Sequence, residues 1–325
     1  MDPCERKLSA FFNHIIESDM ALPELTEIDD RNAQADVVFQ VSADPGEYTR
    51  AREWLHHWRS PDQAVTLSLA GDEERVFLHF PGMARFAIDN TRNNGRLVTC
   101  HARSGLASAT IRHLLLDQVL PRLFAHFFTC TIFHAAFVAV HGKGICFLAD
   151  SGWGKSTIAA GLGAAGHTIL TDDCLNIAVH NNRITGTPAY CGIRLLPDSL
   201  DNLGGSLTMP GEAVAEYTSK KRISLKTSAM QALPIQALFM LTSPQAAKDC
   251  KTPEIEPVGG MYAIKELLKN SFCLDVHDQR WQKLHFQRIS QLAASGLPIF
   301  SLRYPRKYQN LPEVVKAIMK TLDQL

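Results

Sequence analysis

The chain has 325 residues, of which 46% are hydrophobic and 20% are charged, so it can bury one or two ordinary globular cores. It carries 33 basic and 33 acidic residues, and this balance gives no sign of a general attraction to nucleic acid or to a membrane. The eight cysteines are scattered without a C-x-x-C pair, and the first residues are polar and acidic rather than typical of a secretion signal. We therefore expect a cytoplasmic protein with reduced thiols.

The first hundred residues show a weak pattern of short strands. Strands are expected at 37–41, 64–69 and 76–80, where apolar and β-branched residues are concentrated. A turn is expected at 71–74, and residues 47–58 are compatible with a helix. The pattern predicts a small β-rich α+β domain over residues 1–104.

A longer helix is expected over residues 108–128, where apolar residues recur at helical spacing. Pro121 should kink or restart this helix, because proline lacks the amide hydrogen that a helix interior uses. The apolar run over 127–140 is shorter than the roughly 20 residues of a membrane-spanning helix. We interpret it as the end of the helix followed by a buried strand.

Strands and helices then alternate to the end of the chain, which is typical of an α/β domain, here over residues 105–325. Strands are expected at 137–140, 145–148, 168–170, 176–179, 183–185, 237–241 and 299–302, and helices at 155–165, 261–268, 281–294 and from 311 onward.

A phosphate-binding loop is the clearest motif. The stretch Ala149–Ser156 fits the P-loop pattern G-x-x-x-x-G-K-[ST] except at its first position, and it lies between an expected strand and an expected helix. Gly152 and Gly154 allow the backbone to turn its amides toward phosphate oxygens, and the helix N-terminus adds positive partial charge. Lys155 should reach the β- and γ-phosphates, and Ser156 should ligate Mg²⁺. The alternative is a chance glycine-rich turn.

A second glycine motif follows the loop. Residues 161–166 match G-x-G-x-x-G, the dinucleotide-binding fingerprint, but they follow a helix where the fingerprint requires a strand. We interpret these glycines as sites of close packing, with Gly166 ending the helix.

Two adjacent carboxylates, Asp172 and Asp173, follow the next expected strand. The carboxyl ends of strands line the ligand crevice of an open α/β sheet, and adjacent side chains of a strand point to opposite faces. One carboxylate could therefore accept a hydroxyl proton while the other holds a metal ion. The alternative is a turn or helix cap. His134 precedes the loop, and a buried, hydrogen-bonded histidine is its ordinary explanation.

The segment from His134 to Ile177 resembles the kinase domain of HPr kinase/phosphorylase. That family has a histidine fifteen residues before a G-D-S-G-x-G-K-S loop, and a Gly-His-x-x-x-x-Asp-Asp stretch after the helix. Here His134, the loop Ala149–Ser156 and the stretch 166–173 lie at those spacings. The resemblance implies a C-terminal P-loop kinase domain with a central mixed sheet flanked by helices, preceded by the β-rich domain.

The resemblance also implies ATP and Mg²⁺ as cofactors and gives roles to the site residues. Asp172 would be the general base, His134 would lie beside the phosphates, and Lys155 would complete the catalytic set. Ser156 and Asp173 would lie near Mg²⁺. The expected nucleotide-binding residues are Ser151, Gly152, Trp153, Gly154, Lys155, Ser156, Thr157 and Arg194.

Two departures separate the chain from the bifunctional family. Ala149 replaces the first loop glycine, and Gly192 stands where the family's Glu-x-Arg-Gly signature has its glutamate, although Arg194 is retained. The missing carboxylate favours a kinase without the phosphorylase reaction. The bifunctional enzymes are hexamers, so a homo-oligomer is compatible with the resemblance, although the sequence shows no interface signal.

A nearer similarity is to the HPr-kinase-like serine kinases of lasso-peptide biosynthesis, carried by residues 115–121, 194–198, 220–222 and 302–306. Such enzymes phosphorylate the C-terminal serine of a precursor peptide, which would be the protein partner here. Arg194, Lys221, Arg222 and Arg303 are candidates for phosphate or carboxylate contacts, or are solvated surface groups. A small-molecule kinase and a non-catalytic nucleotide sensor remain the alternative functions.

Overall fold

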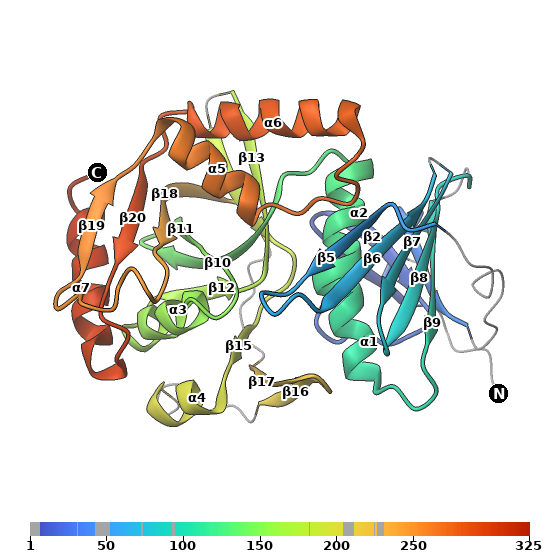
Figure 1. Cartoon of the computed structure of the whole chain (residues 1–325), viewed down its shortest axis with the longest axis horizontal. Helices are drawn as coiled ribbons and strands as arrows, with labels where there is room; N and C mark the ends of the chain where they lie inside the picture. Colours follow the sequence, from blue (N-terminus) through green and yellow to red (C-terminus); the bar gives the residue numbers. More distant parts are fainter. Residues whose placement is uncertain are drawn as a thin grey trace. The chain divides into compact units, whose positions relative to one another are not determined.

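The computed structural model describes residues 7–30, 32–42, 53–72, 74–92, 95–181, 183–203, 211–223, 225 and 231–325. Contacts divide the chain into two units (Figure 1). The first comprises Met1–Leu120 and Asp275–Asp278, and the second comprises Pro121–Leu274 and Gln279–Leu325. The boundary between the two units, after Leu120, thus lies within the helical stretch that the sequence assigns to the second domain. The domain boundary expected near residue 104 stays a prediction.

The first unit contains a nine-stranded sheet in the order β3-β1-β2-β4-β9-β8-β7-β6-β5. Its strands are β1 Lys7–Phe11, β2 His14–Ser18, β3 Thr26–Glu27, β4 Val37–Val41, β5 His56–Arg59, β6 Val65–Gly71, β7 Arg75–Phe80, β8 Ala84–Asp89 and β9 Arg96–Ala102. Neighbours pair antiparallel except β2–β4 and β4–β9, which are parallel. The β-rich character expected of this region is present.

Alternating burial along the strands builds the core of this sheet. In β8 the buried residues Ala84, Phe86 and Ile88 alternate with partly exposed ones, as expected for a strand with one face on a core. The helix expected over 47–58 is wrong at its end, because His56–Arg59 forms β5. There the His57 ring bonds Ser68 on β6 at 2.8 Å, a cross-strand contact that helical geometry would not provide. Residues 47–52 lie outside the described part of the chain.

The expected helix over 108–128 is present in three pieces: α1 Ser108–Leu114, a π-helical turn η2 Leu115–Val119, and α2 Leu120–Phe127. The amide of Leu120 donates to the carbonyl of Leu115, five residues earlier, which is π-helical bonding. Pro121 follows at once. The π turn before a proline confirms the expected local irregularity, because proline cannot donate the helical hydrogen bond.

The second unit is a mixed α/β structure. Its strands are β10 Ile132–Val140, β11 Lys143–Leu148, β12 Thr168–Thr171, β13 Cys174–His180, β14 Arg183–Pro188, β15 Ile193–Leu195, β16 Glu212–Ala215, β17 Thr218–Ile223, β18 Leu233–Leu241, β19 Glu254–Pro257 and β20 Ile299–Arg303. Its further helices are α3 Lys155–Ala164, α4 Pro197–Leu203, α5 Gly260–Asn270, α6 Gln279–Ala293, the 3₁₀ turn η4 Tyr308–Asn310 and α7 Leu311–Leu322.

The main sheet of this unit has eight strands in the order β11-β10-β13-β14-β18-β20-β19, with β12 paired to β10. The strands β11 and β18 also pair, in parallel, which closes part of the sheet on itself. The sheet is therefore mixed, as the sequence predicted. A separate three-stranded sheet has the order β15-β17-β16.

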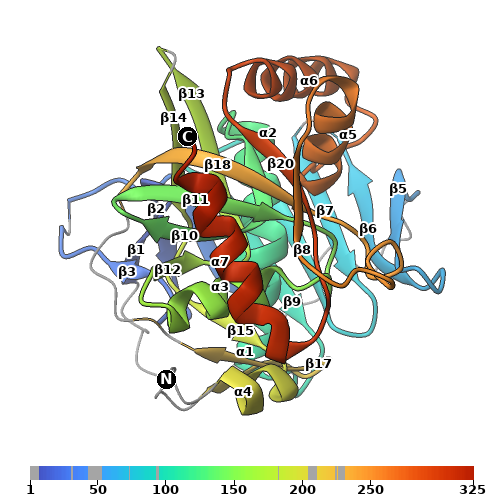
Figure 2. The same cartoon turned by 90° about the vertical axis from the view of Figure 1, so that its left-hand side faces the viewer.

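Two hydrophobic clusters cover opposite sides of the main sheet. Ala136 and Val138 of β10 belong to the cluster with α3 and α7, whereas Ala135 and Phe137 belong to the cluster with α5 and α6. Figures 1 and 2 show these two helix pairs on different sides of the strands. Alternate residues pack on alternate sides, so both faces must be apolar, which explains the almost continuous apolar run of β10.

Glycines 161–166 have the structural role that the sequence suggested. A Cβ on Gly161 would lie 2.7 Å from Leu311 of α7, and one on Gly163 would lie 2.7 Å from Ile169 of β12. Gly166 has a φ of 92°, and the amide of His167 donates to the carbonyl of Leu162 at 3.0 Å. These glycines end α3 and allow close packing, so no dinucleotide fingerprint is formed.

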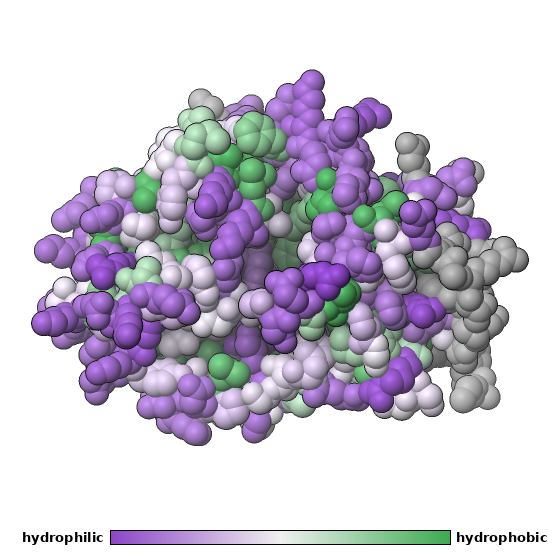
Figure 3. All heavy atoms as spheres, viewed as in Figure 1, coloured by the Kyte–Doolittle hydropathy of each residue, from purple (hydrophilic) through white to green (hydrophobic). Residues whose placement is uncertain are grey.

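The apolar run over 127–140 is, as expected, a helix end followed by the buried strand β10. Within the described ranges, no helix is both long and apolar enough to span a membrane. The face drawn in Figure 3 is mostly polar, with apolar residues in small groups. Met261 and Tyr262, at the start of α5, are adjacent in the sequence and both exposed, with exposed fractions of 71% and 47%.

Candidate functional site

The two glycines of the loop between β11 and α3 have left-handed backbone conformations. Gly152 and Gly154 have φ values of 80° and 94°, which favour glycine. Ala149 is absent from the described residues with positive φ, so this position tolerates a side chain and the departure from the motif does not disturb the turn. The ammonium of Lys155 lies over the loop and donates to the carbonyl of Ala149 at 2.6 Å.

Two cationic side chains contact the loop between Ala149 and Gly154. Lys269 of α5 pairs with the carboxylate of Asp150 at 2.6 Å, and its ammonium lies 4.9 Å from the centre of the Trp153 ring. On another side, Arg306 donates to the Trp153 carbonyl. The Tyr304 hydroxyl donates to the same carbonyl at 3.3 Å. These contacts fix the loop before any ligand binds.

Asp172 and Asp173 follow β12 and have different surroundings. Asp172 is 3% exposed, and its carboxyl accepts a hydrogen bond from the backbone amide of Arg194 at 2.8 Å. The carboxylate of Asp173 lies 3.1 Å from the Arg194 guanidinium and 3.7 Å from the His134 ring. Both aspartates lie in the bend between β12 and β13 and their carboxyls hydrogen-bond to each other, so they do not point to opposite faces as strand alternation had suggested.

These surroundings shift the pKa values of the two carboxyls in opposite directions. Burial, the neighbouring charge of Asp173 and a hydrogen bond between the two carboxyls raise the pKa of Asp172 well above its usual value. Burial would raise the pKa of Asp173 too, but the Arg194 guanidinium and the hydrogen bond from Asp172 outweigh it and lower that pKa. The pair thus holds one proton, on Asp172, over a wide pH range.

Burial also lowers the pKa of the basic groups. It lowers the pKa of Lys155 to about 8, an effect that the nearby ammonium of Lys220 reinforces and the negative charge of Asp173 opposes. Burial, followed by the charge of Lys155, lowers the pKa of His134 well below its usual value. The lowered pKa favours the neutral form of the His134 ring, whose Nε2 lies 3.7 Å from the Asp173 carboxylate.

These side chains meet in one pocket of the second unit. The described residues that line it are His134, Ser151, Gly152, Gly154, Lys155, Ser156, Thr157, Asp173, Arg194, Leu195, Leu196, Ser199 and Lys220. Nearly all of the expected site residues are among them. Two are not: Trp153 contributes its carbonyl to the loop contacts described above, and Asp172 lies behind Asp173.

The basic residues suggested by the sequence are not all at this pocket. Arg194 lines it, but Arg303 pairs with Glu254 at 2.8 Å elsewhere, on an exposed strand edge. Arg222 is buried beside the Tyr190 ring, at 5.9 Å from its centre, and Lys221 is exposed. Lys220, the one member of the 220–222 group not singled out, is the one that lines the pocket.

The lining fits a nucleotide-bound magnesium ion. The hydroxyl of Ser156 and the carboxylate of Asp173 are hard oxygen donors facing one pocket. Mg²⁺ in phosphoryl-transfer sites is commonly held by one or two such protein oxygens together with phosphates and water.

Comparisons with known proteins give limited similarities. No family model matches the chain. Over 57 residues it is 37% identical to the HPr kinase/phosphorylase of Mycoplasmopsis pulmonis (strain UAB CTIP), and this segment spans 18% of the chain and 18% of that protein's length. The structure of the Hpr(Ser) kinase/phosphatase from Coxiella burnetii matches with 14% sequence identity and a TM-score of 0.32, over 59% of this chain and 96% of that one.

Proposed function

We propose that this protein is an ATP-dependent kinase that transfers the γ-phosphoryl group to a serine hydroxyl. The observation that carries the proposal is the meeting of a P-loop, an ionised carboxylate and a magnesium-type hydroxyl ligand in one pocket. Phosphoryl transfer needs these parts, since it depends on positioning and on neutralising phosphate charge. The short segment of similarity to an HPr kinase/phosphorylase supports the same class of reaction.

Each group has a proposed task. The loop amides and Lys155 hold the phosphates, and Ser156 and Asp173 hold Mg²⁺, which neutralises phosphate charge when it is bound. Arg194 positions the carboxyl pair, because its amide bonds Asp172 and its guanidinium bonds Asp173. Asp172 is the proposed general base. Its raised pKa makes it a stronger base than a free carboxylate, but it must lose its own proton before it can act.

The finer proposal concerns the acceptor. The similarity of residues 115–121, 194–198, 220–222 and 302–306 to the serine kinases of lasso-peptide biosynthesis suggests the C-terminal serine of a precursor peptide. Leu195 and Leu196 also line the pocket, and Leu196 is 40% exposed. An exposed apolar side chain at the pocket suits contact with an apolar side chain of a peptide acceptor.

Two other functions use the same pocket. A small-molecule kinase would differ only in its acceptor. A non-catalytic nucleotide sensor would bind ATP without turnover, and the buried, raised-pKa Asp172 beside an intact Lys155 gives no reason for such a loss. The present arrangement of the carboxyl pair therefore favours a kinase.

The test is phosphoryl transfer followed by mass spectrometry. The protein is incubated with ATP, Mg²⁺ and peptides that end in serine, with the same peptides ending in alanine as controls. Phosphorylation of the serine peptides alone, lost in Lys155→Met, is expected. Transfer only to small alcohols would favour the second function, and ATP binding without transfer to any acceptor would favour the sensor.

A further inference from the structure

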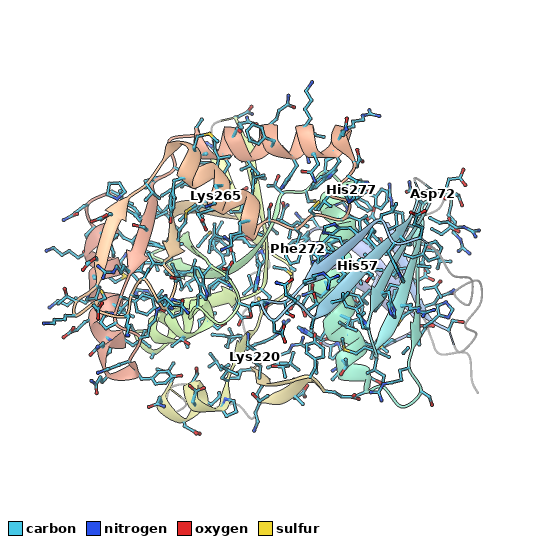
Figure 4. The ribbon with its side chains drawn as sticks, viewed as in Figure 1. His57, Asp72, Lys220, Lys265, Phe272 and His277 are labelled. Atoms are coloured by element: carbon cyan, nitrogen blue, oxygen red, sulfur yellow. The ribbon has the colours of Figure 1, made fainter. Side chains whose placement is uncertain are left out.

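The three-stranded sheet brings a lysine to the phosphate pocket. Strand β17 pairs antiparallel with β15, with Leu195 opposite Lys221 and Arg194 opposite Arg222. Lys220 is the residue before Lys221 on β17, and it lines the pocket together with Lys155 and Asp173. Figure 4 labels Lys220 beside β15, on a part of the chain far in sequence from the P-loop.

Strand geometry separates Lys220 from its neighbour. Adjacent residues of a strand point to opposite faces, so Lys220 and Lys221 cannot both reach the pocket. Lys220 is half-buried and lines the pocket, whereas Lys221 is exposed and does not. The two lysines differ in direction but not in chemistry, so the chain supplies its own matched control.

The charges around Lys220 fit a polyanion. Among the described lining residues, three are cationic, Lys155, Arg194 and Lys220, and one, Asp173, is an ionised carboxylate. Lys155 and Lys220 line the same pocket, so their positive charges repel. Such repulsion raises the free energy of the folded protein, and a bound polyphosphate would turn it into attraction to both cations.

We propose that Lys220 contacts the terminal phosphate of the bound polyphosphate and thereby selects triphosphates over diphosphates. Lys155 reaches the pocket from the loop before α3, while Lys220 reaches it from β17, the strand paired with β15, which carries Arg194. That position is the end of the pocket where transfer takes place under the proposed function. The inference rests on the proposed function only for the identity of the polyphosphate.

The experiment measures binding, so that it does not depend on turnover. Inorganic tripolyphosphate and pyrophosphate are titrated by calorimetry, with and without Mg²⁺, into the wild-type 325-residue chain and into its Lys220→Met, Lys220→Arg and Lys221→Met variants. Lys220→Met should lose ~10-fold or more of its tripolyphosphate affinity, the scale of one charge-assisted hydrogen bond, and about twofold or less of its pyrophosphate affinity. Lys220→Arg should retain most of the tripolyphosphate affinity, and Lys221→Met should match the wild type.

Four outcomes would overturn the inference: an equal loss of tripolyphosphate affinity in the Lys220→Met and Lys221→Met variants, no loss in either, an equal loss of affinity for both ligands in Lys220→Met, or reduced selectivity in a Lys220→Arg variant with a normal unfolding midpoint. Thermal unfolding of each variant identifies a loss caused by misfolding. If Lys220→Met misfolds, Lys220→Arg decides the question. If the wild type selects tripolyphosphate through Lys220 but transfers phosphate to no acceptor, the proposed function fails and this inference stands.

Discussion

The two units bury charged groups in different ways. In the first unit each of two buried carboxylates forms a closed pair with a single basic side chain beside it: Arg112 lies 2.9 Å from Glu24, and His113 lies 2.6 Å from Asp117. In the second unit Lys155 and Arg194 are each 5% exposed or less, and they line one pocket in which the described cations outnumber the carboxylates. In a closed pair the two groups are each other's partners, whereas a cluster with an excess of positive charge is suited to a negatively charged ligand.

The comparison predicts which kind of property each mutation should change. Groups in the pocket should affect binding and rate more than folding, because their charges are arranged toward a ligand. Groups in the closed pairs should affect folding alone. The following experiments test this separation in decreasing order of expected effect.

The largest effect is expected from Asp172→Asn. If Asp172 is the general base, the variant should lose about 10²–10⁴ in the rate of transfer while keeping its affinity for nucleotide. Asp173→Asn should instead weaken the binding of magnesium-loaded nucleotide. Single-turnover transfer and equilibrium binding, measured side by side, separate the two roles. Transfer at full speed by Asp172→Asn would remove it from the mechanism.

A smaller effect is expected from Arg112→Met in the first unit. The carboxylate of Glu24 is 4% exposed and would lose one charged partner, at a cost of roughly 3 kcal/mol in the free energy of unfolding. Tripolyphosphate affinity should stay at the wild-type value. Denaturant unfolding measures the first quantity. The matched control is Arg303→Met, in which both the arginine and its partner Glu254 are exposed, so that a much smaller cost is expected. Similar costs in both variants would contradict the distinction.

The smallest effect is expected in the pH dependence of kcat/KM, which reports groups of the free enzyme. The raised pKa of Asp172 should place the acidic limb above the range of an ordinary aspartate, with the rate rising as Asp172 loses its proton. The rate should fall again as pH passes about 8, where Lys155 loses its charge. Lys155→Arg should move the alkaline limb upward, because arginine stays charged. An alkaline limb that does not move would exclude Lys155 as its cause.

The free energy of unfolding should also depend on the ionisation of Asp172, and this contribution should fall as the pH rises. Because the pKa of Asp172 is higher in the folded state than in the unfolded state, its contribution is fully present below the unfolded value and is lost as pH rises through the folded value. Asp172→Asn, which cannot ionise, removes that dependence.

The sequence predicted much of the second unit because local signals there were strong. The strand–loop–helix pattern around Lys155 and the glycines over 161–166 each have a local physical cause, and the structure contains both. The opposite orientation expected of Asp172 and Asp173 was wrong, because the two carboxyls hydrogen-bond to each other in the bend after β12.

Other features were beyond a local reading. The helix expected over 47–58 failed at β5, where pairing with β6 outweighs local propensity. Lys269 and Arg306 contact the P-loop from residues more than a hundred positions away, and no short motif marks them. Lys220 could not be singled out for another reason. Lys220, Lys221 and Arg222 are consecutive basic residues, and only the strand shows that neighbouring side chains lie on different faces.

The first unit is discontinuous, since Asp275–Asp278 belong to it although they lie late in the chain. Within it, the rings of His56 and His277 lie 5.5 Å apart. A single protease cut, or a stop codon after Leu120, therefore cannot release an intact first unit, because the piece that carries β5 would lack His277. The later part of the chain thus supplies a piece of the first unit, and an exchange of residues 1–120 alone would separate the strands of that unit from the native Asp275–Asp278 segment.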